Sequence, residues 1–127
     1  MNSFRSAIET RDPDAVAAVL ADDVVFRSPI VFQPYAGRAA AVAVLSAVFE
    51  VFEDFAYEAE LASEDGRQHA LTFHARVGDR QIEGCDFVHH DEHGFVDRLT
   101  VMVRPLSGTL ALRGRMTAQL ETHNARL

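Results

Sequence analysis

The sequence predicts an α+β domain in which three N-terminal helices pack on a curved antiparallel sheet, with a possible C-terminal helix. Helix-like segments dominate residues 3–52, and four long strand-like segments separated by turn signals follow them. A run of helices followed by a run of strands is typical of α+β proteins. The chain has 127 residues, 48% of them apolar. This suits a single domain, residues 1–127, whose core needs no disulfide or metal.

The first part of the chain is expected to hold three helices and one short strand. Phe4, Ala7 and Ile8 share one face of the first segment, as in an amphipathic helix. Asp12 suits an N-cap, and Pro13 suits the first turn of the second helix. The third helix is apolar nearly all round, so we expect it to be buried on more than one side. The expected elements are a helix at 3–10, a helix from 13 to about 20, a strand at 24–27, a loop at 30–37 and a helix from 38 to about 52.

The second part is expected to be a meander of four strands. Gly78-Asp79 lies between two alternating segments and predicts a tight hairpin turn. Asp65-Gly66 is a further turn signal, and Pro105 is expected to end the sheet. The expected elements are strands at 55–64, 68–77, 81–90 and 95–104 and a helix from 106 to about 123.

The charged residues exclude several classes of function. All twelve basic residues are arginine, so mechanisms that use a lysine amine, such as Schiff-base formation, are excluded. Nineteen acidic residues bring the net charge to -7. This argues against a nucleic-acid partner, since phosphate binding needs a basic face. The single cysteine, Cys85, excludes an intramolecular disulfide and an all-cysteine metal site.

The sequence shows no targeting segment and no cofactor motif. The N-terminus lacks the apolar core of a signal peptide. The longest apolar run, residues 39–45, is far shorter than a membrane span. The glycines match neither a dinucleotide-binding nor a nucleotide-binding motif. We therefore expect a cytoplasmic protein with no membrane partner and no cofactor.

Strand alternation predicts which side chains face the helices. A two-residue turn at Gly78-Asp79 would pair Leu71 with Asp86 and His69 with Val88. The concavity between a curved sheet and its helices is the default binding site. Asp86 is the one carboxylate expected on this face. The apolar residues expected there include Leu71, Phe73, Ile82, Leu99 and Val101.

Asp86 is the main candidate for a catalytic residue. Burial disfavours the charged carboxylate and should raise its pKa, and a neutral carboxylic acid can donate a hydrogen bond to an enolate-like oxygen. His69 lies diagonally across the hairpin and could orient Asp86 or act as a base. The alternatives are that Asp86 bonds a backbone group or a tyrosine, or lies in water where the sheet curves. His69 could equally be a rim histidine in contact with water.

Several other residues could bind a metal or act in catalysis, but structural roles explain them more simply. His89-His90-Asp91-Glu92-His93 is dense in metal-capable groups. Neighbours in a strand point to opposite faces, so we expect a solvated turn and no metal site. Ser28 lacks the Gly-x-Ser-x-Gly context of a nucleophile and is expected to cap a turn. Cys85 alternates with Asp86 and is expected to be a buried structural thiol, while Tyr35 could rim the cavity.

Five short motifs are spread along most of the chain. They are Asp12-Pro13-Asp14 before a short helix, residues 20–26 with Ser28-Pro29, Gly37 before the third helix, Gly84-Cys85-Asp86-Phe87, and Gly94 followed by residues 95–99. Together they resemble the SnoaL-like members of the nuclear transport factor 2-like superfamily, over roughly residues 3–105. The resemblance implies the cystatin-like cone fold of ketosteroid isomerases and polyketide cyclases, a fold that hosts many activities.

The resemblance also implies roles for individual positions. Asp86 falls where ketosteroid isomerases keep a protonated oxyanion-hole aspartate, and it could match the acidic residue of polyketide cyclases. The general-base aspartate of ketosteroid isomerases corresponds to Ser28, and their oxyanion-hole tyrosine to about Phe4. The arginines do not match the Asp-Arg-Asp network of limonene epoxide hydrolase-like members. A homodimer through the outer sheet face is implied, with Phe87 and Met102 in the interface.

The first functional hypothesis is a cofactor-independent isomerase, cyclase or dehydratase that acts by proton transfer on a carbonyl compound. Asp86 and His69 would be catalytic, in a pocket for a small apolar molecule. The alternatives are a non-catalytic ligand-binding module and a dimerisation domain with a collapsed cavity. The residues expected to line the pocket are Phe4, Leu20, Phe26, Ser28, Tyr35, Leu45, Phe49, Leu71, Phe73, Val88, Leu99 and Val101.

Overall fold

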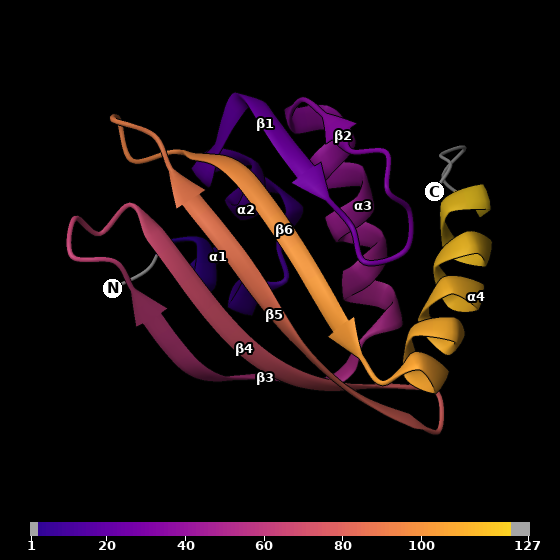
Figure 1. Ribbon diagram of the computed structural model, residues 1–127. Coiled ribbons are helices and arrows are strands. Elements are labelled where there is room, and N and C mark those ends of the chain that lie inside the picture. The colour runs from indigo at the N-terminus through magenta and orange to yellow at the C-terminus, as the bar shows by residue number, and fades with distance from the viewer. Residues whose placement is uncertain (1–2, 123–127) are drawn as a thin grey trace.

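Four helices lie on one side of a curved, six-stranded sheet (Figure 1). The computed structural model describes residues 3–122, with the side chains of residues 3–120. The helices are α1 (Ser3–Thr10), α2 (Pro13–Val19), α3 (Arg38–Val51) and α4 (Leu106–Thr122). The strands are β1 (Leu20–Arg27), β2 (Tyr35–Ala36), β3 (Glu53–Ala62), β4 (Gln68–Val77), β5 (Arg80–His90) and β6 (Val96–Arg104).

The strands lie in the order β2-β1-β6-β5-β4-β3. Strands β3 to β6 form a meander in which neighbouring strands pair antiparallel. β1 runs parallel to β6, the last strand of this meander. A parallel pair needs a long connection between its strands, and here α3 and three strands of the meander separate β1 from β6. The predicted α+β class, with helices on one face, is therefore confirmed, and the sheet is antiparallel apart from this pair.

The passage from α2 to β1 differs from the sequence-based expectation. The helix ends at Val19 and the strand begins at Leu20, whereas the sequence predicts a strand only from residue 24. Asp22 and Asp23 are exposed, and they lie where the pairing of β1 with β6 is irregular. A bulge of this kind lets charged residues project into solvent without ending the strand, so the strand extends through the acidic pair to Leu20.

Two smaller differences concern β2 and the C-terminus. The sequence predicts a loop at 30–37, but Tyr35 and Ala36 pair with β1 as a two-residue strand. Two residues are too few to show strand alternation. The helix α4 begins at Leu106 as expected, and its expected end near His123 lies outside the described residues.

The β4–β5 hairpin decides which way Asp86 faces. Gly78 has a φ of 61°, a left-handed conformation that a two-residue hairpin turn needs at its first central position. The predicted register is confirmed: Leu71 pairs with Asp86, and His69 pairs with Val88. Because a slip of one residue would turn every side chain to the other face, this turn directs Asp86 toward the helices.

The core lies between the inner face of the sheet and the helices. α3 is buried along much of its length, as its apolar sequence predicts. On α4, Leu112, Met116 and Leu120 are spaced by four residues and are all buried, which places them on one face of the helix. α4 packs beside α3 (Figure 1), so the last helix covers one end of the core.

Gly84 in β5 makes room for the ring of Phe73 on β4. A Cβ atom at Gly84 would lie 2.3 Å from Phe73 Cζ and 2.7 Å from the backbone oxygen of Met102. We expect Gly84→Ala to lower the free energy of unfolding by about 1–3 kcal/mol in urea denaturation. Gly114→Ala is the control: a Cβ there meets nothing within 4 Å, so better helix propensity should add about 1 kcal/mol. Equal stability of the Gly84→Ala and wild-type proteins would contradict this packing.

Among the large apolar side chains exposed on the outer face of the sheet are Phe87 and Met102. Phe87 is 44% exposed and Met102 is 58% exposed. The homodimer expected through this face stays a prediction, as does the cytoplasmic location. In the span from residue 3 to residue 122, none of the helices combines the length and apolarity needed to cross a bilayer.

Candidate functional site

A cavity lies between the inner face of the sheet and the helices α1, α3 and α4. Its volume is about 70 Å³, well below the roughly 300–1,000 Å³ of pockets that enclose drug-sized ligands. Most lining side chains are apolar, and Arg11, Ser28, Tyr57 and Asp86 are the polar ones among the described residues. Arg11 is exposed, so the cavity reaches the surface beside it.

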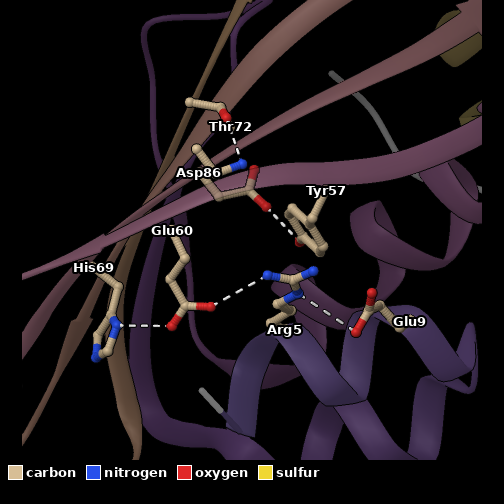
Figure 2. A network of polar contacts seen from close by, with 8 residues as sticks. Arg5, Glu9, Tyr57, Glu60, His69, Thr72 and Asp86 are labelled. Atoms are coloured by element: carbon tan, nitrogen blue, oxygen red, sulfur yellow. Dashed lines mark hydrogen bonds and ion pairs between the residues drawn. The ribbon is translucent and has the colours of Figure 1, made fainter. Parts of the chain in front are cut away.

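Asp86 and Tyr57 form a buried hydrogen-bonded pair at the wall of this cavity (Figure 2). Asp86 comes from β5 and Tyr57 from β3, on either side of β4. The Tyr57 hydroxyl donates to Asp86 Oδ2 over 2.7 Å, and the two residues are only 8% and 7% exposed. A bond to a tyrosine is one of the alternatives that the sequence left open for Asp86. Both side chains also face the space that a ligand would occupy.

Burial changes the acidity of both members of the pair. Loss of solvation raises the pKa of Asp86 to about 7, and the hydrogen bond from Tyr57 opposes part of this rise. The pKa of Tyr57 is raised too, first by burial and then by the charge of Asp86. Near neutral pH, Asp86 is therefore present in both protonated and ionised forms, whereas Tyr57 keeps its proton. Such a carboxyl group can give or take a proton.

Aromatic packing orients Tyr57 toward Asp86. The ring of Phe55 meets the Tyr57 ring edge-on, with centroids 4.9 Å apart. The ring of Phe73 lies nearly perpendicular to it, with centroids 6.3 Å apart. Edge-to-face pairs contribute about 0.5–1.5 kcal/mol beyond the area that they bury. The phenol ring is therefore held from two sides, and its hydroxyl is directed at the carboxyl group.

His69 does not contact Asp86, although the sequence predicts that it could. Its Nε2 atom lies 2.9 Å from the carbonyl oxygen of Gly66. Its Nδ1 atom lies 3.5 Å from Glu60 Oε2 (Figure 2). His69 is not among the residues that line the cavity. The side chain that hydrogen-bonds to Asp86 is instead Tyr57, from β3.

Most residues expected to line a pocket do line this cavity. They are Phe4, Phe26, Ser28, Leu45, Phe49, Phe73, Leu99 and Val101. Their side chains come from α1, β1, α3 and the inner face of the sheet, together with the segment that follows β1. The third hypothesis from the sequence, a dimerisation domain without a void of ligand size, stays a prediction, because this cavity is far smaller than most ligand pockets.

Four expected lining residues lie elsewhere. Leu20 and Leu71 are fully buried in the core. Tyr35 belongs to β2 and stacks on Phe26, with ring centroids 6.0 Å apart. Val88 borders a separate groove that also includes His69. Strand alternation predicts the face to which a side chain points but not its position along the curved sheet, which is why Leu71 and Val88 lie away from the cavity. The sequence predicts Leu20 in a helix and Tyr35 in a loop, whereas they lie in β1 and β2.

Sequence reasoning missed Tyr57, Arg11 and the contribution of α4. Tyr57 alternates with Phe55, and this period of two would have placed it on the face of that apolar ring. Arg11 donates through Nη2 to two backbone carbonyl groups near the end of α3. Leu112 and Met116 of α4 also line the cavity. Their spacing predicts an apolar stripe, but only the tertiary structure shows what that stripe faces.

The contacts of Ser28 and the orientation of Cys85 suit structural roles. Ser28 Oγ accepts the backbone N–H groups of Ile30 and Val31, each at 3.3 Å, so it caps a turn as predicted. Cys85 is half-buried rather than buried, because it points to the outer face of the sheet. Partial burial raises the pKa of its thiol, and the charge of Asp86 adds to this rise.

The segment from His89 to His93 forms the end of β5 and a turn. The carboxylate of Asp91 accepts the backbone N–H groups of His93 and Phe95. His89 pairs instead with Asp97 on β6. Among residues 3–120, no three metal-capable side chains come together in a way that could hold an ion.

Known proteins share both the sequence pattern and the fold of this chain. The model of the SnoaL-like domain matches residues 2–99. The chain belongs to the SnoaL-like family. Its membership agrees with the nuclear transport factor 2-like superfamily that the sequence motifs resemble. A comparison with curated protein sequences produced no match.

Two solved structures are similar to this SnoaL-like domain along nearly its whole length. A steroid delta-isomerase from Pseudomonas aeruginosa is 42% identical, with a TM-score of 0.90 over 95% of this chain and 88% of that chain. An uncharacterized protein with a cystatin-like fold from Silicibacter pomeroyi DSS-3 is 30% identical, with a TM-score of 0.91 over 96% and 85%. These similarities confirm the predicted cystatin-like architecture.

A third solved structure is related through the fold alone. The epoxide hydrolase/cyclase-like enzyme SalBIII is 18% identical to the SnoaL-like domain, with a TM-score of 0.66. The match covers 84% of this chain and 87% of that chain. At this identity the likeness concerns architecture and carries no residue roles.

Proposed function

We propose that this SnoaL-like protein is a cofactor-independent isomerase, cyclase or dehydratase that moves a proton on a small, largely apolar carbonyl compound. The observation that carries the proposal is the buried Asp86, whose pKa of about 7 suits a group that both removes and returns a proton near neutral pH. The similarity to a protein described as a steroid delta-isomerase supports the same class of chemistry.

In the proposed reaction Asp86 serves as base and then as acid. The ionised carboxylate removes a proton from the carbon next to the carbonyl group, and the electron pair of the broken C–H bond forms an enolate. The protonated Asp86 then returns the proton to another carbon, so the isomer has the same atoms as the substrate. Oδ2 accepts the hydrogen bond from Tyr57, and Oδ1 is left to meet the substrate.

Tyr57 supplies the phenol of the proposed site from a strand rather than from the first helix. Phe4 and Ser28, which stand where ketosteroid isomerases keep a tyrosine and an aspartate, line the cavity but cannot act as phenol or general base. The proposed site therefore has one acid/base group and one phenol, side by side. The volume of about 70 Å³ favours a small substrate, or one that inserts only its reacting end.

Phenols of graded acidity test this proposal, because a phenolate mimics the oxygen of the enolate, and the protonated Asp86 that forms with the enolate can donate a hydrogen bond to that oxygen. We expect phenols to bind more tightly than apolar isosteres without the hydroxyl group, and Asp86→Asn to lose about ten- to hundredfold of this preference. Calorimetry between pH 5 and 9 would measure it. Asp97→Asn is the matched control, since Asp97 pairs with His89 on another part of the sheet.

The outcome separates the enzyme from a non-catalytic binding module. Equal binding of phenols and isosteres, or an Asp86→Asn protein that still discriminates between them, would contradict the role of Asp86. Exchange of the α-protons of a small ketone with D2O, followed by NMR, adds a test of chemistry. Exchange that depends on Asp86 indicates an enzyme, whereas ligand binding without exchange indicates a binding module.

A further inference from the structure

Arg5 links the Asp86–Tyr57 pair to charged residues on α1 and β3 (Figure 2). Its guanidinium carbon Cζ lies 5.4 Å from the centroid of the Tyr57 ring. The same guanidinium pairs through Nε with Glu9 at 3.6 Å and through Nη1 with Glu60 at 3.4 Å. A residue near the start of α1 therefore touches the ring whose hydroxyl binds Asp86.

An irregularity in β3 brings Glu60 to the same side as Tyr57. Residues three apart in a regular strand point to opposite faces. Tyr57 and Glu60 are three apart, but their partners on β4 are only two apart, which is the mark of a bulge. Within it, the backbone N–H of Ala59 donates to Thr72 Oγ1 over 3.0 Å. The bulge thus lets β3 present both a phenol and a carboxylate to α1.

The position of Arg5 is determined by more than one element. Glu9 holds it from its own helix and Glu60 holds it from β3. Glu60 also approaches β4, since its second carboxylate oxygen lies 3.5 Å from His69 Nδ1. The Arg5 side chain is 31% exposed and that of Glu60 is 27% exposed, so water screens these pairs less than it screens fully exposed ones.

We propose that Arg5 is a positioning residue for the Tyr57–Asp86 pair: its guanidinium packs on the Tyr57 ring and keeps the phenol hydroxyl against the Asp86 carboxyl group. The inference rests on the proposed function for the chemical role of that pair. A guanidinium on an aromatic ring attracts the ring electrons and restricts ring motion. Its positive charge also works against the rise in the pKa of Tyr57 that burial causes, whereas the charge of Glu9 adds to that rise.

NMR of the free protein tests this role without any substrate. In Arg5→Met we expect the pKa of Asp86, followed through its side-chain carboxyl carbon, to rise by about half a pH unit. We also expect the Tyr57 hydroxyl proton to exchange faster with water. In Arg5→Lys, which keeps the charge without the planar group, the hydroxyl should again exchange faster while the pKa moves less. Arg80→Met, at the exposed start of β5, removes the same charge and should change neither quantity.

The outcomes distinguish this inference from the proposed function. A lower melting temperature in Arg5→Met with an unchanged pKa of Asp86 and unchanged hydroxyl exchange would mean that Arg5 only stabilises the fold. If Arg5→Met does not fold, Arg5→Gln, which keeps polar contacts to both glutamates, takes its place with the same expectations. A wild-type Asp86 that titrates near its ordinary value would instead overturn the proposed acid/base role.

Discussion

Asp86→Asn is expected to make the folded protein more stable at pH 8 and to remove a pH dependence of stability between about pH 4 and pH 7. The pKa of Asp86 is about 7 in the folded protein, against an ordinary value of 3.8. Between these values the folded state binds more protons than the unfolded state, so the free energy of unfolding falls as the pH rises through this window. Above pH 7 the full cost of the buried charge is present, at most about 4 kcal/mol.

Urea denaturation at several pH values would measure this effect as the difference between Asp86→Asn and wild type. Other titrating groups are common to both proteins and cancel in that difference. Asparagine keeps an oxygen that can accept the Tyr57 hydrogen bond, so the variant is expected to fold. Asp23→Asn, at an exposed position of β1, is the control. Its free energy of unfolding should change with pH in the same way as that of wild type. If that of Asp86→Asn also changes in this way, Asp86 is not the buried, neutral-range acid described above.

Tyr57→Phe is expected to destabilise the protein and to shift Asp86 further toward its protonated form. The substitution removes the donor to Asp86 Oδ2. Since that hydrogen bond lowers the pKa of Asp86, its loss should raise the pKa above 7. At pH 8 the ionised carboxylate would be left without its partner, at a cost of about 1–3 kcal/mol in the free energy of unfolding. Near pH 5 the loss should be smaller, because the carboxyl group is protonated.

The measurement is an NMR titration of Asp86 together with thermal unfolding at pH 5 and pH 8. For the proposed reaction, the pH at which Asp86 is half ionised should move upward in the same variant. Tyr35→Phe is the matched control, since Tyr35 lies in β2 and does not line the cavity. An Asp86 pKa equal in Tyr57→Phe and wild type would show that the phenol does not influence the carboxyl group.

Local patterns were enough to predict the class of fold and the face to which Asp86 points. A period of two in β4 and β5, joined by a turn that begins with Gly78, leaves one register, and that register pairs Leu71 with Asp86. Apolar neighbours on the same face then imply burial and a raised pKa. These inferences succeed because each depends on residues close together in the sequence, where backbone geometry alone relates one side chain to the next.

The partner of Asp86 could not be predicted in this way. Asp86 and Tyr57 lie on strands separated by β4, and alternation alone does not show which side chains meet across a curved sheet. His69 was the nearer candidate in the flat hairpin, but in the curved sheet it is Tyr57, from β3, that reaches the carboxyl group. The bulge leaves no mark in the apolar pattern, so the pairing of Glu60 with the Arg5 that packs on this ring was equally hidden.

By itself the sequence determined that the chain forms helices over one face of a curved sheet and that Asp86 faces inward. The tertiary structure alone decided that Tyr57 binds Asp86, that Arg5 packs on Tyr57, and that Leu112 and Met116 of α4 complete the cavity wall. The physical reason is the range of the interactions. Periodicity and turns act over a few residues, whereas this site is built from segments that meet only after the sheet has curved and the last helix has packed.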